Sequence, residues 1–249
     1  MNTITKTIAS TYEQENRVKL FELFNNSPIY KNEQINNIGL YLKRQELSKI
    51  LFFNEIYSQI KNVHGVIFEF GVRWGQNLTT LNNLRGIYEP YNHSRKIVGF
   101  DTFEGFEGVT DKDGVHDYNV KGAFSVADNY QDHLDEVLKC HENESPLNHI
   151  SKNLTIKGDA VKTLEEYLNN HKETIVAFAY FDFDIYKPTL ECLKLIAPYL
   201  TKGSILGFDE LCDPGFPGET EALREVFGTL KWSIRRNQFS GIQSYLIVE

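Results

Sequence analysis

Acidic side chains follow several apolar runs of the sequence, each where a buried strand is expected to end. Asp101 ends IVGFD, Asp182 ends TIVAFAYFD, and Asp209 and Glu210 end ILGFDE. Because the carboxyl ends of parallel strands meet at one edge of an α/β sheet, where ligands bind, we expect these acids to form one site. Carboxylate oxygens are the ligands that Mg²⁺ or another hard divalent ion prefers. Since the acids also repel one another, we expect something positive among them.

Glu69 is the one charged residue of a short apolar run, VIFEF, which is typical of a buried parallel strand. Gly71 and Gly75 follow, and then a helical pattern begins. Strand, glycine turn and helix in this order are the first half of a nucleotide-binding βαβ unit, whose helix N-terminus offers free N–H groups to an anion. A buried carboxylate must be compensated, either by a cationic ligand amine or by neighbouring backbone N–H groups.

The glycine spacing disfavours a dinucleotide, because Arg73 of GVRWG occupies the position of the middle glycine in GxGxxG. An acid at the end of the second strand, here Asp101, typically binds the ribose hydroxyls of a nucleotide. Asp159 follows a third strand, NLTIKG, and precedes a helical pattern. It is either the N-cap of that helix or a contact to an adenine ring.

A long acidic, glycine-rich stretch between residues 102 and 130 shows little periodicity, which favours a functional lid or a mobile segment. His116 lies in it and is a candidate base, although a lone loop histidine is more often simply hydrated. Asp184, two residues after Asp182, points the same way if the chain stays extended. Capping of the next helix is the favoured alternative for Asp184.

Composition excludes several classes of protein. With 41% hydrophobic and 24% charged residues among 249, the chain is expected to fold around a core. A net charge of −8 makes non-specific binding to nucleic acid or to an anionic membrane unfavourable. Three widely spaced cysteines lack a zinc-binding spacing, which predicts free thiols in a reducing cytoplasm. A signal peptide and a transmembrane segment are not expected.

The order of patterns predicts an α/β fold with a doubly wound, Rossmann-like parallel sheet. Residues 1–62 carry helical spacing and form an N-terminal appendage, a lid or an oligomerisation segment, so that a homo-oligomer is expected. Simple packing of these helices over the sheet is the alternative. Residues 63–249 contain five βα units. The segments KWSIRRNQF and GIQSYLIVE then close the sheet as an antiparallel hairpin.

Five segments, EFGVRWG, GFDTFEGF, KGDAVKTL, YFDFDIYKPTLECLKLIAPYLTKGS and GFDEL, resemble the macrocin O-methyltransferase family. These are class I S-adenosylmethionine-dependent enzymes that methylate sugar hydroxyls of natural products, and the likeness covers about residues 60–225. Two departures are visible. Members often have Asp-Asp where this chain has Asp209–Glu210, and neither the N-terminal helices nor residues 107–130 match a family motif.

The resemblance implies that Glu69 and Gly71 hold the methionine end of S-adenosylmethionine, that Asp101 holds its ribose, and that Asp159 lies near its adenine. Asp182, Asp209 and Glu210 would hold Mg²⁺ or another hard divalent cation, and Asp182 or His116 would accept the proton. The complete set of residues expected at the cofactor is Glu69, Gly71, Arg73, Gly75, Asp101, Thr102, Phe103, Asp159 and Ala160.

The function implied is a cytoplasmic, metal-assisted O-methyltransferase that acts on a sugar hydroxyl of a sugar nucleotide, glycan or glycosylated natural product. A catalytically inactive cofactor-binding module of the same fold is one alternative, and a methyltransferase for a non-sugar small molecule is another. A metal-dependent phosphohydrolase is disfavoured, because the sequence has neither a phosphate-binding lysine motif nor an aspartyl nucleophile signature.

Overall fold

The computed structural model describes residues 9–114 and 117–249 and contains two compact units. The first unit is Met1–Ser48 and the second is Lys49–Glu249, so the division falls within one helix, α3 (Arg44–Ile60).

The second unit is built on a mixed sheet with the strand order β3-β2-β1-β4-β5-β7-β6. The strands are β1 (Val66–Phe70), β2 (Ile97–Asp101), β3 (Asn153–Lys157), β4 (Val176–Phe181), β5 (Leu200–Phe208), β6 (Arg235–Arg236) and β7 (Ser244–Ile247). From β3 to β5 all neighbours are parallel, whereas β7 is antiparallel to both β5 and β6. The chain reverses its strand order between β1 and β4, and such switch points are where α/β sheets bind ligands.

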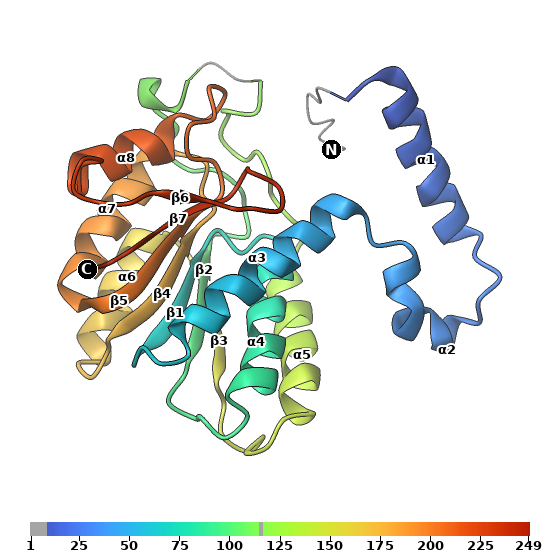
Figure 1. Cartoon of the computed structure of the whole chain (residues 1–249), viewed down its shortest axis with the longest axis horizontal. Coiled ribbons are helices and arrows are strands. Elements are labelled where there is room, and N and C mark those ends of the chain that lie inside the picture. The colour runs from blue at the N-terminus through green and yellow to red at the C-terminus, as the bar shows by residue number, and fades with distance from the viewer. Residues whose placement is uncertain (1–8, 115–116) are drawn as a thin grey trace. The chain divides into compact units, whose positions relative to one another are not determined.

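Helices cover both faces of this sheet (Figure 1). The helices of the second unit are the later part of α3, α4 (Gln76–Tyr88), α5 (Tyr130–Asn143), α6 (Ala160–Asn170), α7 (Tyr186–Ile196) and α8 (Gly218–Val226), with 3₁₀ turns at Asp111–Asp113 and Ala197–Tyr199. One hydrophobic core packs α6, α7 and α8 against the sheet, and a second core packs α3, α4 and α5 against its other face.

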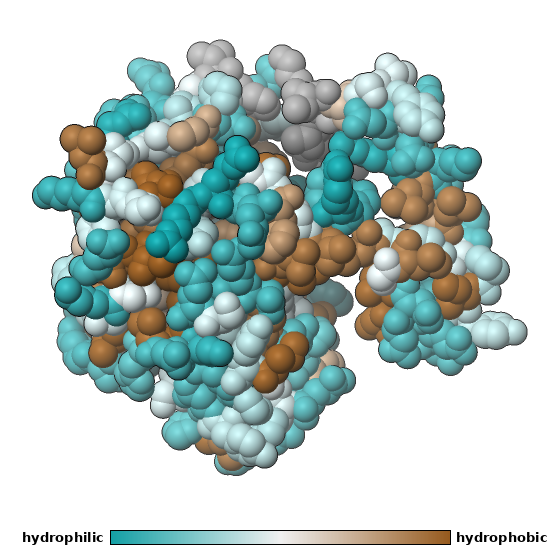
Figure 2. Space-filling model, in the orientation of Figure 1, coloured by the Kyte–Doolittle hydropathy of each residue, from teal (hydrophilic) through white to brown (hydrophobic). Residues whose placement is uncertain are grey.

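The first unit is described by itself. It contains α1 (Thr11–Asn25), α2 (Lys31–Gln34) and a 3₁₀ turn, Ile35–Leu40. Ser10 and Glu13 form a capping box at the start of α1, which satisfies N–H groups that a helix end leaves free. None of these three elements has a buried residue, and large apolar side chains such as Tyr12 and Phe21 are exposed. Apolar surface is visible on this unit in Figure 2.

The fold class predicted from the sequence is confirmed. The five βα units, the closing antiparallel hairpin and helices on both faces are all present. The stretch between residues 102 and 130 differs from a structureless loop, because it contains the 3₁₀ turn Asp111–Asp113. The three cysteines form no disulfide, as predicted. No helix within the described residues is long and apolar enough to cross a membrane.

Gly71 directly follows β1 with φ +90°, in a region that side chains rarely adopt, and it lies against the residue that follows β4. A Cβ at this position would come within 2.0 Å of the backbone oxygen of Asp182. The first glycine of the turn is therefore needed for the close approach of β1 and β4. Gly75 is also closely packed: a Cβ added there would lie 2.3 Å from the Leu134 side chain.

This close approach predicts a large stability difference between two glycine substitutions. Gly71→Ala should lower the free energy of unfolding by at least ~3 kcal/mol, because backbone strain and overpacking add. Gly108→Ala is the control: Gly108 also has a positive φ, but nothing lies within 4 Å of its added Cβ, so strain alone should cost ~1–2 kcal/mol. The measurement is urea unfolding followed by circular dichroism. Equal losses in both variants would contradict the close packing at Gly71.

Candidate active site

Side-chain alternation places three of the expected acids on the same face of the sheet, at its carboxyl edge. Phe68 and Phe70 of β1 belong to the core under α6–α8, so Glu69 between them points toward α3 and α4. The backbone pairing continues past the strand ends: the Asp182 N–H donates to Phe70 O at 2.8 Å, and the Asp209 N–H donates to Phe181 O at 3.0 Å. The sheet therefore brings Glu69, Asp182 and Asp209 together.

Glu69 is fully buried, and neither of its carboxylate oxygens has a hydrogen-bond partner among the described residues. The expectation that it accepts hydrogen bonds from neighbouring backbone N–H groups is therefore wrong. Burial raises the pKa of Glu69 well above its usual range and the nearby charge of Asp182 raises it further, while the side chains of Asn77 and Lys49 act in the opposite direction. A buried carboxylate without a partner is costly, so Glu69 is suited to a cationic group that enters from outside the protein.

Lys49 supplies the positive charge that the acids require. Its Nζ lies 3.3 Å from Asp182 Oδ2 and 3.2 Å from Asp209 Oδ1, and it thus bridges β4 and β5. Burial opposes the charged form of Lys49, but the two carboxylates outweigh it and raise the pKa of the ammonium above its usual value. Lys49 is therefore charged at neutral pH.

Neutral donors hold the same two carboxylates in place. The amide of Asn77, in the first turn of α4, donates to Asp182 Oδ2 at 3.1 Å. Asp209 Oδ1 accepts from the Tyr180 hydroxyl and, at 3.0 Å, from the Gln243 amide. Residues of α3, α4 and β4, and the residue just before β7, thus converge on these two oxygens.

The two linked acids have different pKa values. Burial and the adjacent charge of Asp209 raise the pKa of Asp182 to about 6. Burial also acts to raise the pKa of Asp209, but Lys49 and the hydrogen bonds from Tyr180 and Gln243 outweigh it, so this pKa is lowered. Near neutral pH, Asp182 is thus the more basic member of the pair.

Three further carboxyl groups lie near this pair. Burial and neighbouring acids raise the pKa of Asp184 and Glu219 well above their usual ranges and that of Glu210 to about 9. The Glu210 N–H donates to Glu219 Oε2 at 3.2 Å. Glu210 Oε2 and Glu219 Oε1 are buried and have no hydrogen-bond partner in the described part of the chain.

The three acids expected to bind a metal are neighbours, but they are not arranged as a ready coordination shell. Among the described residues, no group of three or more His, Cys, Asp or Glu side chains is placed to hold a metal ion. Lys49 lies between Asp182 and Asp209, while Glu210 interacts with Glu219. The donor set still fits a hard divalent cation chemically, since Glu210 offers a buried carboxylate oxygen without a partner.

Asp101 binds the backbone of the turns that surround it. Its Oδ2 accepts from the Arg73 N–H at 2.7 Å and its Oδ1 from the Phe103 N–H at 2.6 Å. Arg73 and Phe103 both have positive φ values, so these bonds stabilise unusual backbone. Thr102 accepts from the Glu104 N–H and donates to the Gly105 carbonyl. The carboxylate still has lone pairs for ligand hydroxyls, because each oxygen accepts more than one bond.

Two acids of the candidate site lie at helix starts. Asp159 is the N-cap of α6, accepts from the Val161 N–H at 3.0 Å and precedes Ala160, the first residue of that helix. Asp184 does not have the expected capping role. The first N–H of α7, that of Tyr186, donates to Asp113 instead.

Asp113 fixes the stretch after β2 to the start of α7. Its side chain is fully buried, and Thr110 donates to it through both its N–H and its hydroxyl. A Cβ on Gly218, at the start of α8, would come within 2.8 Å of Asp113 Oδ1. Lys112 adds a hydrogen bond of 2.6 Å to the Tyr186 hydroxyl. Part of the expected lid is therefore docked on the two helices that follow the acidic strand ends.

Several of these residues were missed by the sequence analysis. The inward position of Lys49 could have been predicted from the sequence. Lys49 precedes Phe52 and Phe53 by one helical turn and so shares their buried face. Asn77, Tyr180, Gln243, Glu219 and Asp113 had no comparable signal. His116, a predicted candidate base, lies outside the described residues.

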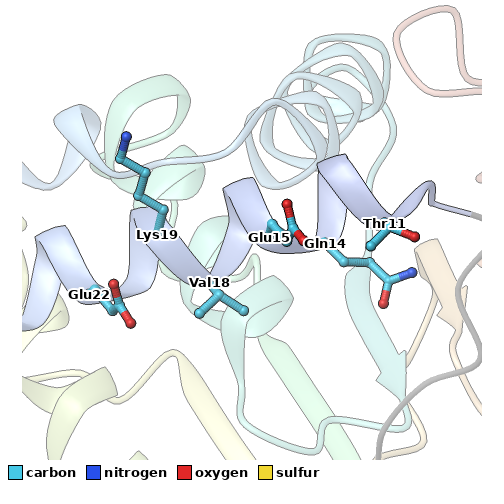
Figure 3. Close-up of a pocket in the computed structure, with 6 residues that line it drawn as sticks. All are labelled: Thr11, Gln14, Glu15, Val18, Lys19 and Glu22. Atoms are coloured by element: carbon cyan, nitrogen blue, oxygen red, sulfur yellow. The ribbon is translucent and has the colours of Figure 1, made fainter.

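The first unit has a pocket on α1, which is formed by residues far from these acids in the sequence (Figure 3). It is lined by side chains along one helix, namely Thr11, Gln14, Glu15, Val18, Lys19 and Glu22. It contains none of the residues described above and is not the candidate active site.

Two solved structures are similar to this chain over nearly its whole length. A crystal structure of CalS11, a calicheamicin methyltransferase, is 42% identical, covers 97% of this chain and 94% of its own, and has a TM-score of 0.94. An apo structure of CalS11, described as a TDP-rhamnose 3'-O-methyltransferase of calicheamicin biosynthesis, is 39% identical, with coverages of 97% and 96% and a TM-score of 0.85.

A more distant neighbour is the O-methyltransferase NovP, 15% identical with a TM-score of 0.56, which covers 81% of this chain and 79% of its own. That likeness concerns the fold alone. Searches against protein-family models and against curated proteins gave no match.

The buried Asp113 predicts which substitution releases the docked stretch. Asp113→Ala should lower the free energy of unfolding by roughly 1–3 kcal/mol, because the N–H groups of Tyr186 and Thr110 lose their acceptor. Trypsin should then cut faster after Lys112 and Lys121. Asp111→Ala, at an exposed position of the same 3₁₀ turn, is the control and should leave both measurements unchanged. Unchanged cleavage in Asp113→Ala would show that this contact does not hold the stretch.

Proposed function

We propose that this chain, which belongs to the S-adenosylmethionine-dependent O-methyltransferases that include CalS11, methylates a hydroxyl group of a sugar nucleotide, glycan or glycosylated natural product. The observation that carries the proposal is the position of Glu69, a fully buried carboxylate without a partner among the described residues. It lies at the switch point between β1 and β4, and the charge of Asp182 acts on it.

The residues after β1 and β2 fit the cofactor. Glu69 would accept hydrogen bonds from the amino group of the methionine moiety, which removes the cost of its burial. Asp101 would accept hydrogen bonds from the ribose hydroxyls and keeps the turns at Arg73 and Phe103 in shape. Asp159, already the cap of α6, would lie near the adenine. S-adenosylmethionine supplies an electrophilic methyl group to this site.

The acids after β4 would act on the acceptor hydroxyl. Methyl transfer requires that the acceptor oxygen be aligned with the methyl group and that it lose its proton. Asp182, whose pKa is raised to about 6 by burial and by Asp209, is ionised at neutral pH and basic enough to take a proton. Asp184, two residues further on and also of raised pKa, is a second candidate. His116 remains a proposed alternative base.

A hard divalent cation such as Mg²⁺ is the second component of the proposal. Asp182, Asp209 and Glu210 would hold it, and the buried Glu210 oxygen without a partner supports this choice. When bound, such an ion supplies a Lewis acid that lowers the pKa of a sugar hydroxyl.

The wider setting of the enzyme is also proposed. The motifs around Glu69, Asp101 and Asp182 favour the macrocin O-methyltransferase group, and the sugar substrate of CalS11 supports a sugar acceptor. Free cysteines favour the cytoplasm. Exposed apolar side chains on α1 favour a homo-oligomer, in which residues 1–62 serve as lid or contact surface.

Cofactor choice follows from Glu69 and Asp101. S-adenosylmethionine, or its demethylated product, should raise the melting temperature, and NAD should not. Asp101→Ala should weaken cofactor binding by tenfold or more, since each lost bond from a hydroxyl to a charged oxygen is worth ~1–3 kcal/mol. Asp132→Ala, at an exposed position on α5, is the control. Binding is measured by calorimetry. Stabilisation by NAD alone would overturn the cofactor assignment.

Methyl transfer itself is tested with isotopically labelled cofactor and a panel of nucleotide sugars, TDP-rhamnose included. Label should appear on a sugar hydroxyl. Asp182→Ala should reduce the rate by ~10²-fold or more, because proton acceptance by a positioned group contributes about that much.

Metal dependence is tested by chelation. Chelation should abolish turnover and spare cofactor binding, and added Mg²⁺ should restore turnover.

The other outcomes point to the alternatives. Cofactor binding without transfer to any acceptor would favour an inactive binding module. Transfer only to non-sugar acceptors would favour a methyltransferase for another small molecule. Full activity after chelation would remove the metal from the proposal and leave the methyltransferase assignment in place.

A further inference from the structure

Lys49 reaches the acids from a helix outside the parallel βα units. Four buried residues of α3, Phe52, Phe53, Ile56 and Ile60, define the face that packs on the sheet. Lys49 lies one turn before the first two of them, so the same packing directs it inward, toward the carboxyl edge of β4 and β5. Its position is thus fixed by the hydrophobic core, and its contacts with Asp182 and Asp209 follow from that.

The ammonium binds one oxygen of each of two carboxylates that would hold a metal ion. Lys49 Nζ lies 3.3 Å from Asp182 Oδ2 and 3.2 Å from Asp209 Oδ1. Mg²⁺ binds oxygen at ~2.0–2.1 Å, so an ion shared by these two oxygens would occupy the space between them. That space already contains the ammonium, and two cations so close also repel one another.

The other contacts of these oxygens do not have to change when the cation does. Asn77 donates to Asp182, while Tyr180 and Gln243 donate to Asp209. These donors are neutral and come from α4, from β4 and from the residue just before β7, so they can keep the two carboxylates oriented with either cation present. Lysine has a long, flexible side chain that can withdraw along its helix.

We propose that Lys49 and a divalent cation exclude one another at the oxygen pair of Asp182 and Asp209, so that Lys49 is the resident counter-ion of the metal-free enzyme and lowers its apparent metal affinity. The inference rests on the metal component of the proposed function. It assigns to Lys49 a regulatory role: the acids stay neutralised and in place before the metal arrives, and metal binding then requires the ammonium to leave.

The first test is the affinity for Mn²⁺, a hard divalent ion whose free form is measured by electron paramagnetic resonance. Lys49→Met keeps most of the side-chain length and removes the charge, so the apparent dissociation constant for Mn²⁺ should fall at least tenfold relative to the wild type. Lys61→Met, at an exposed position just beyond the end of α3, is the matched control and should bind as the wild type does. Equal or weaker binding by Lys49→Met would overturn the competition, as would absence of binding in every variant.

A second measurement needs no variant. Because binding linkage is reciprocal, Mn²⁺ should displace Lys49 as strongly as Lys49 opposes Mn²⁺. Amine acetylation of the wild-type protein, read by mass spectrometry, should therefore increase at Lys49 when Mn²⁺ is saturating and stay constant at Lys61. Unchanged Lys49 labelling at saturating Mn²⁺ would overturn the inference. Neither test requires turnover, so failure of the competition is distinguishable from failure of methyl transfer.

Discussion

The central constraint on this structure is the concentration of carboxylates at a poorly hydrated edge of the sheet. Asp182, Asp184, Asp209, Glu210 and Glu219 act on one another there, and most of their pKa values are raised. Burying so many acids is costly unless a cation or shared protons relieve the repulsion. Within the described chain, Lys49 is the ammonium in direct contact with two of them, and Asp209 has a lowered pKa largely because of it.

The sheet explains why the acids occur together. Parallel strands deliver their carboxyl ends to one edge, and the side-chain period of two sends Glu69, Asp182 and Asp209 to the same face. The absence of a side chain at Gly71 lets the ends of β1 and β4 approach closely, which brings Glu69 and Asp182 within electrostatic reach. The crossing from β1 to β4 thus places the acid proposed to bind the cofactor near an acid proposed to act on the acceptor.

The sequence predicted the fold and the strand-end acids, because both depend on local periodicity and on topology. The apolar runs placed Glu69 in a buried strand and Asp101, Asp182 and Asp209 at strand ends, without any knowledge of contacts. It did not predict which partner each acid would have. Lys49 lies seventeen residues before the start of β1, and only the docking of α3 on the sheet brings it to the ends of β4 and β5. The spacing from Lys49 to Phe52 and Phe53 did contain that information.

Asp113 was beyond prediction for a different reason, since its role depends on the tertiary position of a stretch without periodicity. It replaces Asp184 as the residue that binds the first N–H of α7, and Asp184 is consequently left with the acids. The short segment from Asp182 to Tyr186 therefore carries the acceptor-side acids at one end and the anchor of the docked stretch at the other. The anchor of the stretch after β2 and the acids Asp182 and Asp184 therefore lie on one short, covalently continuous segment. The structure thus links the segment expected to cover a substrate to the groups proposed to deprotonate it.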